Sequence, residues 1–195
     1  MNKFDEETHK YTRNGIENPS VTEICEPISF KRLDALSKSI LEQARQRGKE
    51  IHELCEEYAL IQEITDDMRE SQYSPYIANF IEWFKTYQPN VIYAEKSLFS
   101  AKLGYCGTCD LLCEIDNKLT LVDYKATSAI DKKSLSVQLV GYKRLLAEYG
   151  FQTQAEMVLH LKKDGYVYKP ITLDQEWFDI LLRHNQKLKE KYNGK

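Results

Sequence analysis

Apolar residues recur with the spacing of an α-helix in four parts of the chain. Positions three, four or seven apart share one helix face, and this pattern predicts helices at about 33–60, 74–89, 135–149 and 175–192. Gly48 interrupts the first pattern, so we expect a break in the helix or a close contact there. Gly150 follows the third pattern in the C-cap position, where a glycine readily ends a helix.

The segments between these helices alternate polar and apolar residues and therefore favour strands. Three successive antiparallel strands are predicted within residues 91–126, the last two joined by a turn at Asp116–Asn117. Two further strands join at Asp164–Gly165, and an N-terminal hairpin is predicted over Tyr11–Val21 around Asn14–Gly15. Together these elements predict an α/β fold with a central mixed sheet of about five strands flanked by helices.

The length and composition narrow the class of protein. The 195 residues suit one domain, or one domain with an extension. No apolar run reaches about 18 residues, and the start, MNKFDEETHK, has neither the basic nor the apolar region of an export signal. The five cysteines are an odd number, which fits free thiols in a reducing compartment. We therefore expect a soluble protein of the cytoplasm with no membrane segment.

Charge is spread unevenly along the chain. The formal net charge of -3 counts against a protein that coats nucleic acid nonspecifically, because such binding neutralises many phosphates. Residues 50–70 hold eight acidic residues and one base, whereas residues 131–170 hold seven bases and four acids. The second segment is the better candidate for a surface that faces phosphates. An ordinary solvated helix face remains an equal alternative on charge alone.

Asp110, Asp123 and Lys125 are the residues whose pattern points to chemistry. Asp123 and Lys125 are two apart in a predicted strand, so their side chains emerge on one face, and hairpin pairing would bring Asp110 alongside. Two carboxylates, water and a backbone carbonyl such as that of Tyr124 are the oxygen ligands that Mg²⁺ or Mn²⁺ prefers. Lys125 would orient or help deprotonate an attacking water, or stabilise developing negative charge. Alternatively, Asp123 and Lys125 form a local ion pair on the polar side of a sheet.

The order of motifs around these residues resembles the PD-(D/E)XK nuclease superfamily, in its RecB-like branch and the allied phage and prophage exonucleases. In that branch a Gly-x-x-Asp precedes an Asp/Glu-x-Lys, and a downstream helix carries Gln-x-x-x-Tyr. Here these segments are Gly107 to Asp110, Asp123 to Lys125, and QLVGY from Gln138. The opening FDEETHKYTRNGIENPSVTEI is also similar to phage-type members, so the resemblance extends from residue 4 to about 149.

The resemblance implies a restriction-endonuclease-like core and further site residues. A histidine on an upstream helix is a metal ligand in that branch and matches His52, and an acidic strand residue matches Glu95 as a metal or water ligand. Gln138 and Tyr142 lie one helical turn apart and would support the site and contact DNA. The cations that flank this helix and would meet the phosphate backbone are Lys132, Lys133, Lys143 and Arg144.

Each of these residues also has a purely structural interpretation. A single helical histidine such as His52 is more often a core or surface residue than a ligand. Glu95 would then be an exposed strand glutamate, and Tyr142 part of the apolar stripe of its helix.

Cys106, Cys109 and Cys113 include a Cys-x-x-Cys pair, which is half of a common zinc site. No second Cys/His pair lies nearby, and alternation places Cys109 and Cys113 on one strand face, opposite Asp110, as small buried side chains. Some RecB-like nucleases carry an iron–sulfur cluster on four cysteines, most of them toward the C-terminus. Because no cysteine follows Cys113, we expect neither an iron–sulfur cluster nor zinc.

These patterns and the resemblance predict a single nuclease domain over 1–195. It would comprise a hairpin and helices over 1–90, a catalytic core at about 91–170 and a C-terminal helix at 175–192. We expect Mg²⁺- or Mn²⁺-dependent hydrolysis of DNA by an exonuclease that serves phage or prophage recombination or repair in a bacterial or phage-infected cell. Expected partners are DNA, further copies of the chain, and a single-strand annealing or recombination protein.

Three alternatives to that function stay open at this stage. One is a structure-selective or restriction-like endonuclease, because cleavage geometry depends on the loops around the site. Another is a catalytically silent, nuclease-like module that binds DNA. The third is a protein-interaction domain that uses the acidic segment 50–70 as its surface.

Overall fold

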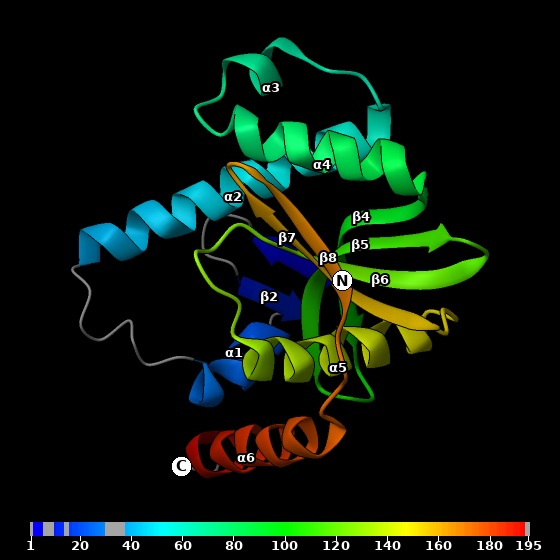
Figure 1. Ribbon diagram of the computed structural model, residues 1–195. Coiled ribbons are helices and arrows are strands. Elements are labelled where there is room, and N and C mark those ends of the chain that lie inside the picture. The colour runs from blue at the N-terminus through cyan, green and yellow to red at the C-terminus, as the bar shows by residue number, and fades with distance from the viewer. Residues whose placement is uncertain (1, 6–9, 14–15, 30–37, 194–195) are drawn as a thin grey trace.

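A five-stranded sheet forms the centre of the protein in the computed structural model, which describes residues 2–5, 10–13, 16–29 and 38–193 (Figure 1). The sheet order is β4-β5-β6-β7-β8. Its strands are β4 (Asn90–Ser100), β5 (Tyr105–Ile115), β6 (Lys118–Lys125), β7 (Ala155–Lys162) and β8 (Gly165–Pro170). β6 and β7 are parallel and the other neighbours are antiparallel, which confirms the predicted mixed sheet.

Tight turns join the hairpins of this sheet where they were predicted. Asp116 and Asn117 both have positive φ, 51° and 59°, as a two-residue turn between β5 and β6 requires. Gly165 follows Asp164 at the turn into β8, and its φ of 145° is one that other residues rarely adopt. The first of these turns fixes the register in which β5 meets β6, and so the placement of the acidic residues on both strands.

Helices cover both faces of the sheet (Figure 1). α2 (Lys38–Ile61) and α4 (Ser74–Tyr87) pack on one face, and α5 (Lys132–Glu148) packs on the other, with α6 (Gln175–Asn193) outside α5. The four predicted helices are therefore confirmed, although residues 33–37 lie outside the described part. The short helix α3 (Asp66–Glu70) was not predicted. No described helix is long and apolar enough to span a membrane.

Two glycines of these helices behave differently from each other. α2 continues through Gly48, and a Cβ built there would meet no atom within 4 Å, so the predicted break or close contact is wrong. Gly150 ends α5 as predicted, with a φ of 89°. Its N–H donates to the Ala147 carbonyl, and the Phe151 N–H donates to the Leu146 carbonyl, which is the Schellman pattern.

A second, three-stranded sheet lies at the N-terminus. β1 (Asn2–Asp5), β2 (Lys10–Arg13) and β3 (Ile16–Asn18) are antiparallel neighbours in that order. The β2–β3 pairing confirms the predicted hairpin, whose turn at residues 14–15 lies outside the described part. β1 was not predicted.

The chain leaves the second sheet through a short helix rather than further extended chain. The Ser20 hydroxyl accepts the Glu23 N–H, and the Glu23 carboxylate accepts the Ser20 N–H, which forms a capping box. This cap begins α1 (Val21–Cys25), which is followed by the 3₁₀ turn η1 (Glu26–Ile28). The predicted hairpin therefore ends before Val21, because its last residues satisfy their backbone groups in a helix.

The apolar side chains form two clusters, one on each face of the five-stranded sheet. Cys113 is buried in the cluster under α2 and α4, whereas Cys109 is buried in the cluster under α5. The predicted shared face is therefore wrong. The alternation of β5 is interrupted at Asp110, which together with Glu95 is missing from the β4–β5 ladder.

Candidate metal centre

The β5 and β6 strands separate at the residues that the motifs singled out. Their ladder ends at Leu111 and Val122, one residue short of Asp110 and Asp123. Beyond that point the Tyr124 N–H donates to the Asp110 carboxylate, with 2.6 Å between N and Oδ2. The predicted hairpin therefore brings Asp110 alongside Asp123. The carboxylate takes the place of a neighbouring strand and holds β6 in position.

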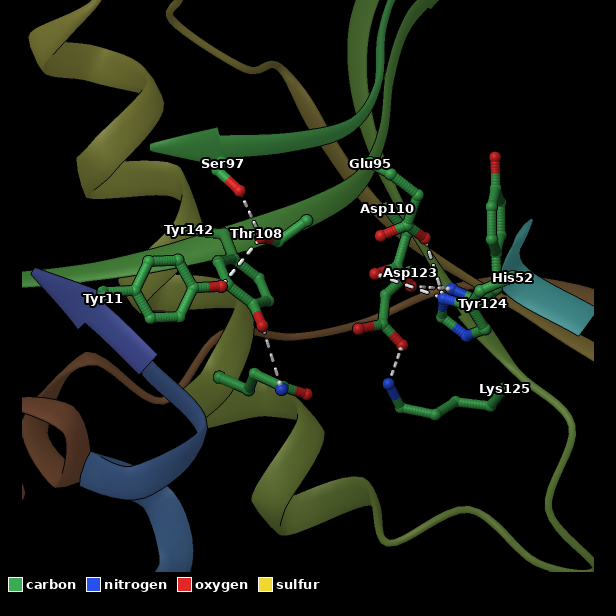
Figure 2. A network of polar contacts seen from close by, with 11 residues as sticks. Tyr11, His52, Glu95, Ser97, Thr108, Asp110, Asp123, Tyr124, Lys125 and Tyr142 are labelled. Atoms are coloured by element: carbon green, nitrogen blue, oxygen red, sulfur yellow. Dashed lines mark hydrogen bonds and ion pairs between the residues drawn. The ribbon is translucent and has the colours of Figure 1, made fainter. Parts of the chain in front are cut away.

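His52, Glu95 and Asp110 converge at this opening (Figure 2). The His52 Nδ1 atom lies 2.8 Å from the Glu95 Oε1 atom and 3.8 Å from the Asp110 Oδ1 atom. One candidate ligand atom from each residue lies within 4.8 Å of the other two. The imidazole packs edge-on against the Tyr124 ring, 5.6 Å between centroids, and the buried Ile51 anchors α2 beside it.

Glu95 reaches His52 through an unusual backbone conformation. Its φ of 42° lies in the left-handed region, which a glutamate in the middle of a strand seldom adopts. The β4–β5 register passes from Ala94 opposite Leu111 to Lys96 opposite Cys109 without a Glu95 pair. Such strain is characteristic of functional sites, and here it turns the carboxylate toward the imidazole.

Asp123 and Lys125 form an ion pair at the same opening. The Lys125 Nζ atom lies 2.6 Å from the Asp123 Oδ2 atom, and the Asp123 side chain is 3% exposed against 26% for Lys125. Their common face of β6 was predicted, and so was the alternative of an ion pair. Asp123 is outside the three-residue group, and Figure 2 shows its carboxylate directed to the ammonium.

The site is short of positive charge. Burial raises the pKa of Asp123 to about 6 against the influence of Lys125, and burial with the nearby Glu95 raises the pKa of Asp110. Burial alone would lower the pKa of Lys125 and of His52. The neighbouring carboxylates outweigh it, so the pKa of Lys125 rises and that of His52 reaches about 9. The three carboxyl groups outnumber the two cationic side chains, and this excess of negative charge favours the binding of a further cation.

Tyr142 and Gln138, which the motif order assigned to the site, lie on α5 and contact each other and α1. The Gln138 Nε2 atom lies 3.2 Å from the Tyr142 hydroxyl and 3.3 Å from the Thr22 hydroxyl of α1. The Tyr142 ring lies directly over Gly107, where a Cβ would sit 2.8 Å from Cε1 of the ring and 3.1 Å from Cγ2 of Val21. The glycine of the Gly-x-x-Asp motif is thus the residue that lets α5 and α1 approach β5.

A row of hydroxyl groups continues the site on the same strands and had no sequence signal. Thr108 and Ser97 are paired across β5 and β4, with their hydroxyls 2.9 Å apart, and lie two residues from Asp110 and Glu95. The Tyr11 hydroxyl of β2 lies 2.7 Å from the Thr108 hydroxyl (Figure 2). The N-terminal sheet therefore contacts β5, the strand that carries Asp110. Neither composition nor spacing relates Tyr11 to Thr108.

The four cations expected to meet phosphates fall into two groups. Lys143 pairs with Glu156 at 2.7 Å, and Arg144 pairs with Asp179 of α6, so both carry structural ion pairs. Lys132 and Lys133 are exposed at the start of α5, and the Lys133 Nζ atom lies 4.0 Å from the Trp177 ring centre. Of the four, Lys132 and Lys133 are the better placed to meet a polyanion.

The sequence matches no protein-family model and no curated protein. Among solved structures, the alkaline exonuclease LHK-Exo from Laribacter hongkongensis matches over 91% of this chain and 94% of its own, with 12% identity and a TM-score of 0.39. LHK-Exo in complex with dAMP matches over the same shares with 13% identity and a TM-score of 0.41. SSO0001 matches over 74% of this chain and 85% of its own, with 10% identity and a TM-score of 0.34. Similarity this low leaves the functional assignment to the geometry of the site.

Proposed function

We propose that the protein is a metal-dependent deoxyribonuclease that hydrolyses phosphodiester bonds. The observation that carries the proposal is the convergence of His52, Glu95 and Asp110 within 4.8 Å, at the strand opening that also holds the Asp123–Lys125 pair. One imidazole, three carboxylates and one ammonium around a deficit of positive charge fit a divalent cation and a phosphate substrate.

The metal would be held by His52, Glu95 and Asp110, with Asp123 and the backbone carbonyl of Tyr124 as further oxygen donors. When bound, a divalent ion lowers the pKa of water and neutralises charge on the reacting phosphate. Carboxylates suit both Mg²⁺ and Mn²⁺, whereas an imidazole ligand suits transition metals better than Mg²⁺. We therefore infer that Mn²⁺ supports activity at least as well as Mg²⁺.

Lys125 would act on the charge that develops during cleavage. In hydrolysis a water oxygen bonds to phosphorus and the water loses a proton, while the bond from phosphorus to the leaving sugar oxygen breaks and the sugar oxygen gains a proton. The Lys125 ammonium, fixed by Asp123 at 2.6 Å, is a hydrogen-bond donor and not an acceptor. Among the roles considered for this lysine, orienting the water and stabilising negative charge therefore fit better than removing a proton.

Tyr142 and Gln138 would form the α5 wall of the substrate site. The hydrogen bond between them, 3.2 Å from the Gln138 Nε2 atom to the Tyr142 hydroxyl, fixes their orientation. We infer from the motif order that the activity is that of a RecB-like exonuclease acting on phage or prophage DNA in the cytoplasm. A homo-oligomer and a recombination protein as partners remain part of that proposal.

The proposal is tested by incubating the protein with a plasmid in linear and in closed circular form, with Mn²⁺, Mg²⁺ or a chelator. We expect metal-dependent loss of the linear form alone, and loss of that activity in Lys125→Ala but not in Lys118→Ala, an exposed lysine on the same strand. Cleavage of the circle would instead identify an endonuclease. Cleavage in chelator, or full activity of Lys125→Ala, would contradict the mechanism.

A further inference from the structure

A groove opens beside the metal centre, between the first half of α2, the chain that leads into α4, and the loop that joins β6 to α5. Its volume is about 1020 Å³. The polar and aromatic side chains of its wall that matter here are Gln43, Gln46, Arg47, Gln72, Tyr73 and Lys163.

The groove begins close to the proposed metal ligands. Arg47 precedes His52 by five residues in α2, which is about 7.5 Å along a helix axis. Thr127, on the opposite wall, follows Lys125 by two residues and so lies at most about 7 Å farther along the chain. Stacked nucleotides in one strand advance by about 3.4 Å each, so these offsets along α2 and along the chain correspond to roughly two nucleotides.

The wall combines the groups that bind a nucleic-acid strand without reading its sequence. Arg47 is half-buried, and its Nε atom is buried with no hydrogen-bond partner in the described part of the chain. Lys163 is exposed, and Tyr73 is a half-buried aromatic ring that packs edge-on against Tyr76, 6.5 Å between centroids. Cations that follow a backbone and aromatic rings that stack on bases are the usual components of single-strand sites.

Among the described residues of the wall one is acidic, and its charge is compensated within the fold. Asp131 caps α5, and its carboxylate accepts the Ser134 N–H at 3.1 Å, which places the negative charge at the positive end of a helix. The charge that the groove presents is therefore set mainly by Arg47 and Lys163.

The size of the groove favours one strand over two. A cube of this volume would be about 10 Å on a side. A double helix is larger than that, because its major groove by itself is roughly 12 Å wide. We propose that this groove binds a single strand of DNA and leads its end to the metal centre. The proposal rests on the nuclease function above and names its substrate as a single-stranded segment.

Binding can be measured without cleavage, by fluorescence anisotropy of the full chain in a chelator, with a labelled 12-nucleotide oligothymidine and with a duplex of the same length. We expect tighter binding of the single strand. Arg47→Gln should weaken it about tenfold and reduce the slope of log K against log salt by about 0.7, the value for one lost phosphate contact with a single strand. Tyr73→Ala should weaken binding without changing that slope.

Two further variants keep the test decisive. Arg45→Gln changes the same residue type on the same helix at an exposed position outside the groove wall, and should weaken binding less than twofold. Lys163→Gln, at an exposed position, should reproduce the slope change even if Arg47→Gln proves unstable in thermal unfolding.

The proposal is overturned if Arg47→Gln and Lys163→Gln match Arg45→Gln, or if the duplex binds more tightly and loses affinity equally in these variants. Because these measurements need no metal, they test strand binding independently of the proposed nuclease activity. A protein that binds the strand in this groove but cleaves nothing would contradict only that first proposal.

Discussion

Glu95 and its neighbours show how the site depends on single side chains. The carboxylate lies 2.8 Å from the His52 ring, and the strained φ of 42° at this residue directs it there. Loss of groups that merely support a ligand costs about 10- to 100-fold in metal affinity, so loss of a ligand itself should cost at least about tenfold. We predict this for Glu95→Gln in calorimetric titration with Mn²⁺. Glu114→Gln, an exposed glutamate of β5, is the matched control, and equal affinities for both variants would exclude Glu95 as a ligand.

Tyr11 allows the contribution of a single hydrogen bond to the stability of the fold to be measured. The residue is buried, and its hydroxyl lies 2.7 Å from the Thr108 hydroxyl, across the boundary between the two sheets. Tyr11→Phe should therefore lower the free energy of unfolding by about 0.5–1.5 kcal/mol. Tyr149→Phe, whose hydroxyl bonds to Phe99 at an exposed position, should change it less in the same urea titration. A larger loss for Tyr149→Phe would show that the contact between the sheets contributes little.

The residues of the site differ in how far sequence could identify them. Asp123 and Lys125 follow from strand periodicity and the motif order, and the Asp116–Asn117 turn sets the register that brings Asp110 beside them. Glu95 could be considered only by resemblance, because its place depends on a backbone angle that no pattern encodes. Tyr11 could not be found, since its contact with Thr108 joins two separate sheets.

At the scale of elements, two glycines should respond in opposite directions to the same change. A Cβ at Gly107 would lie 2.8 Å from the Tyr142 ring, so Gly107→Ala should destabilise the fold by about 1–3 kcal/mol as α5 and α1 are pushed from β5. A Cβ at Gly48 meets nothing within 4 Å inside α2, so Gly48→Ala should stabilise by about 0.5–1 kcal/mol. Urea unfolding of both variants measures the difference. Equal effects would contradict the packing described here.

Elements with a strong period were predictable, and those fixed by packing or capping were not. The stripes of α4 and α5 identified both helices because burial on one face selects for them. α1 and α3 have five residues each, so neither is long enough to show a period. The break or close contact predicted at Gly48 was wrong because tertiary packing of the other residues stabilises a helix in spite of one glycine.

At the scale of the whole molecule, the charge distribution limits how DNA can be bound. The net charge is -3, and Lys143 and Arg144 are held in ion pairs. If the contacts come from Arg47, Lys163 and the exposed lysines at the start of α5, about four phosphates are neutralised, which predicts a slope of log K against log salt near -3 for a single strand. Anisotropy between about 50 and 200 mM salt measures it. A slope steeper than about -5 would mean that cations other than these four contact the strand.

The overall α/β architecture could be predicted from the sequence, whereas the tertiary contacts between its elements could not. Periodicity indicated the five strands and four helices, but the opening at Asp110 and Asp123 depends on where β5 and β6 stop pairing. The groove beside it depends on how α2, the chain before α4 and the β6–α5 loop approach one another. These are contacts between residues far apart in the sequence, and they decide which motif residues lie close enough to bind the same metal ion.

In the proposed nuclease, the carboxylate of Asp110 belongs to the metal centre that cleaves DNA. The direct test is the rate of linear DNA cleavage by wild type and Asp110→Asn over a range of Mn²⁺ concentrations. Asparagine keeps an oxygen that can accept the Tyr124 N–H but removes the charge, so the fold should persist. A metal contributes several kcal/mol to such reactions, and we predict a loss of about 100-fold or more at every concentration. Cleavage by Asp110→Asn at the wild-type rate, with the same dependence on Mn²⁺, would contradict it.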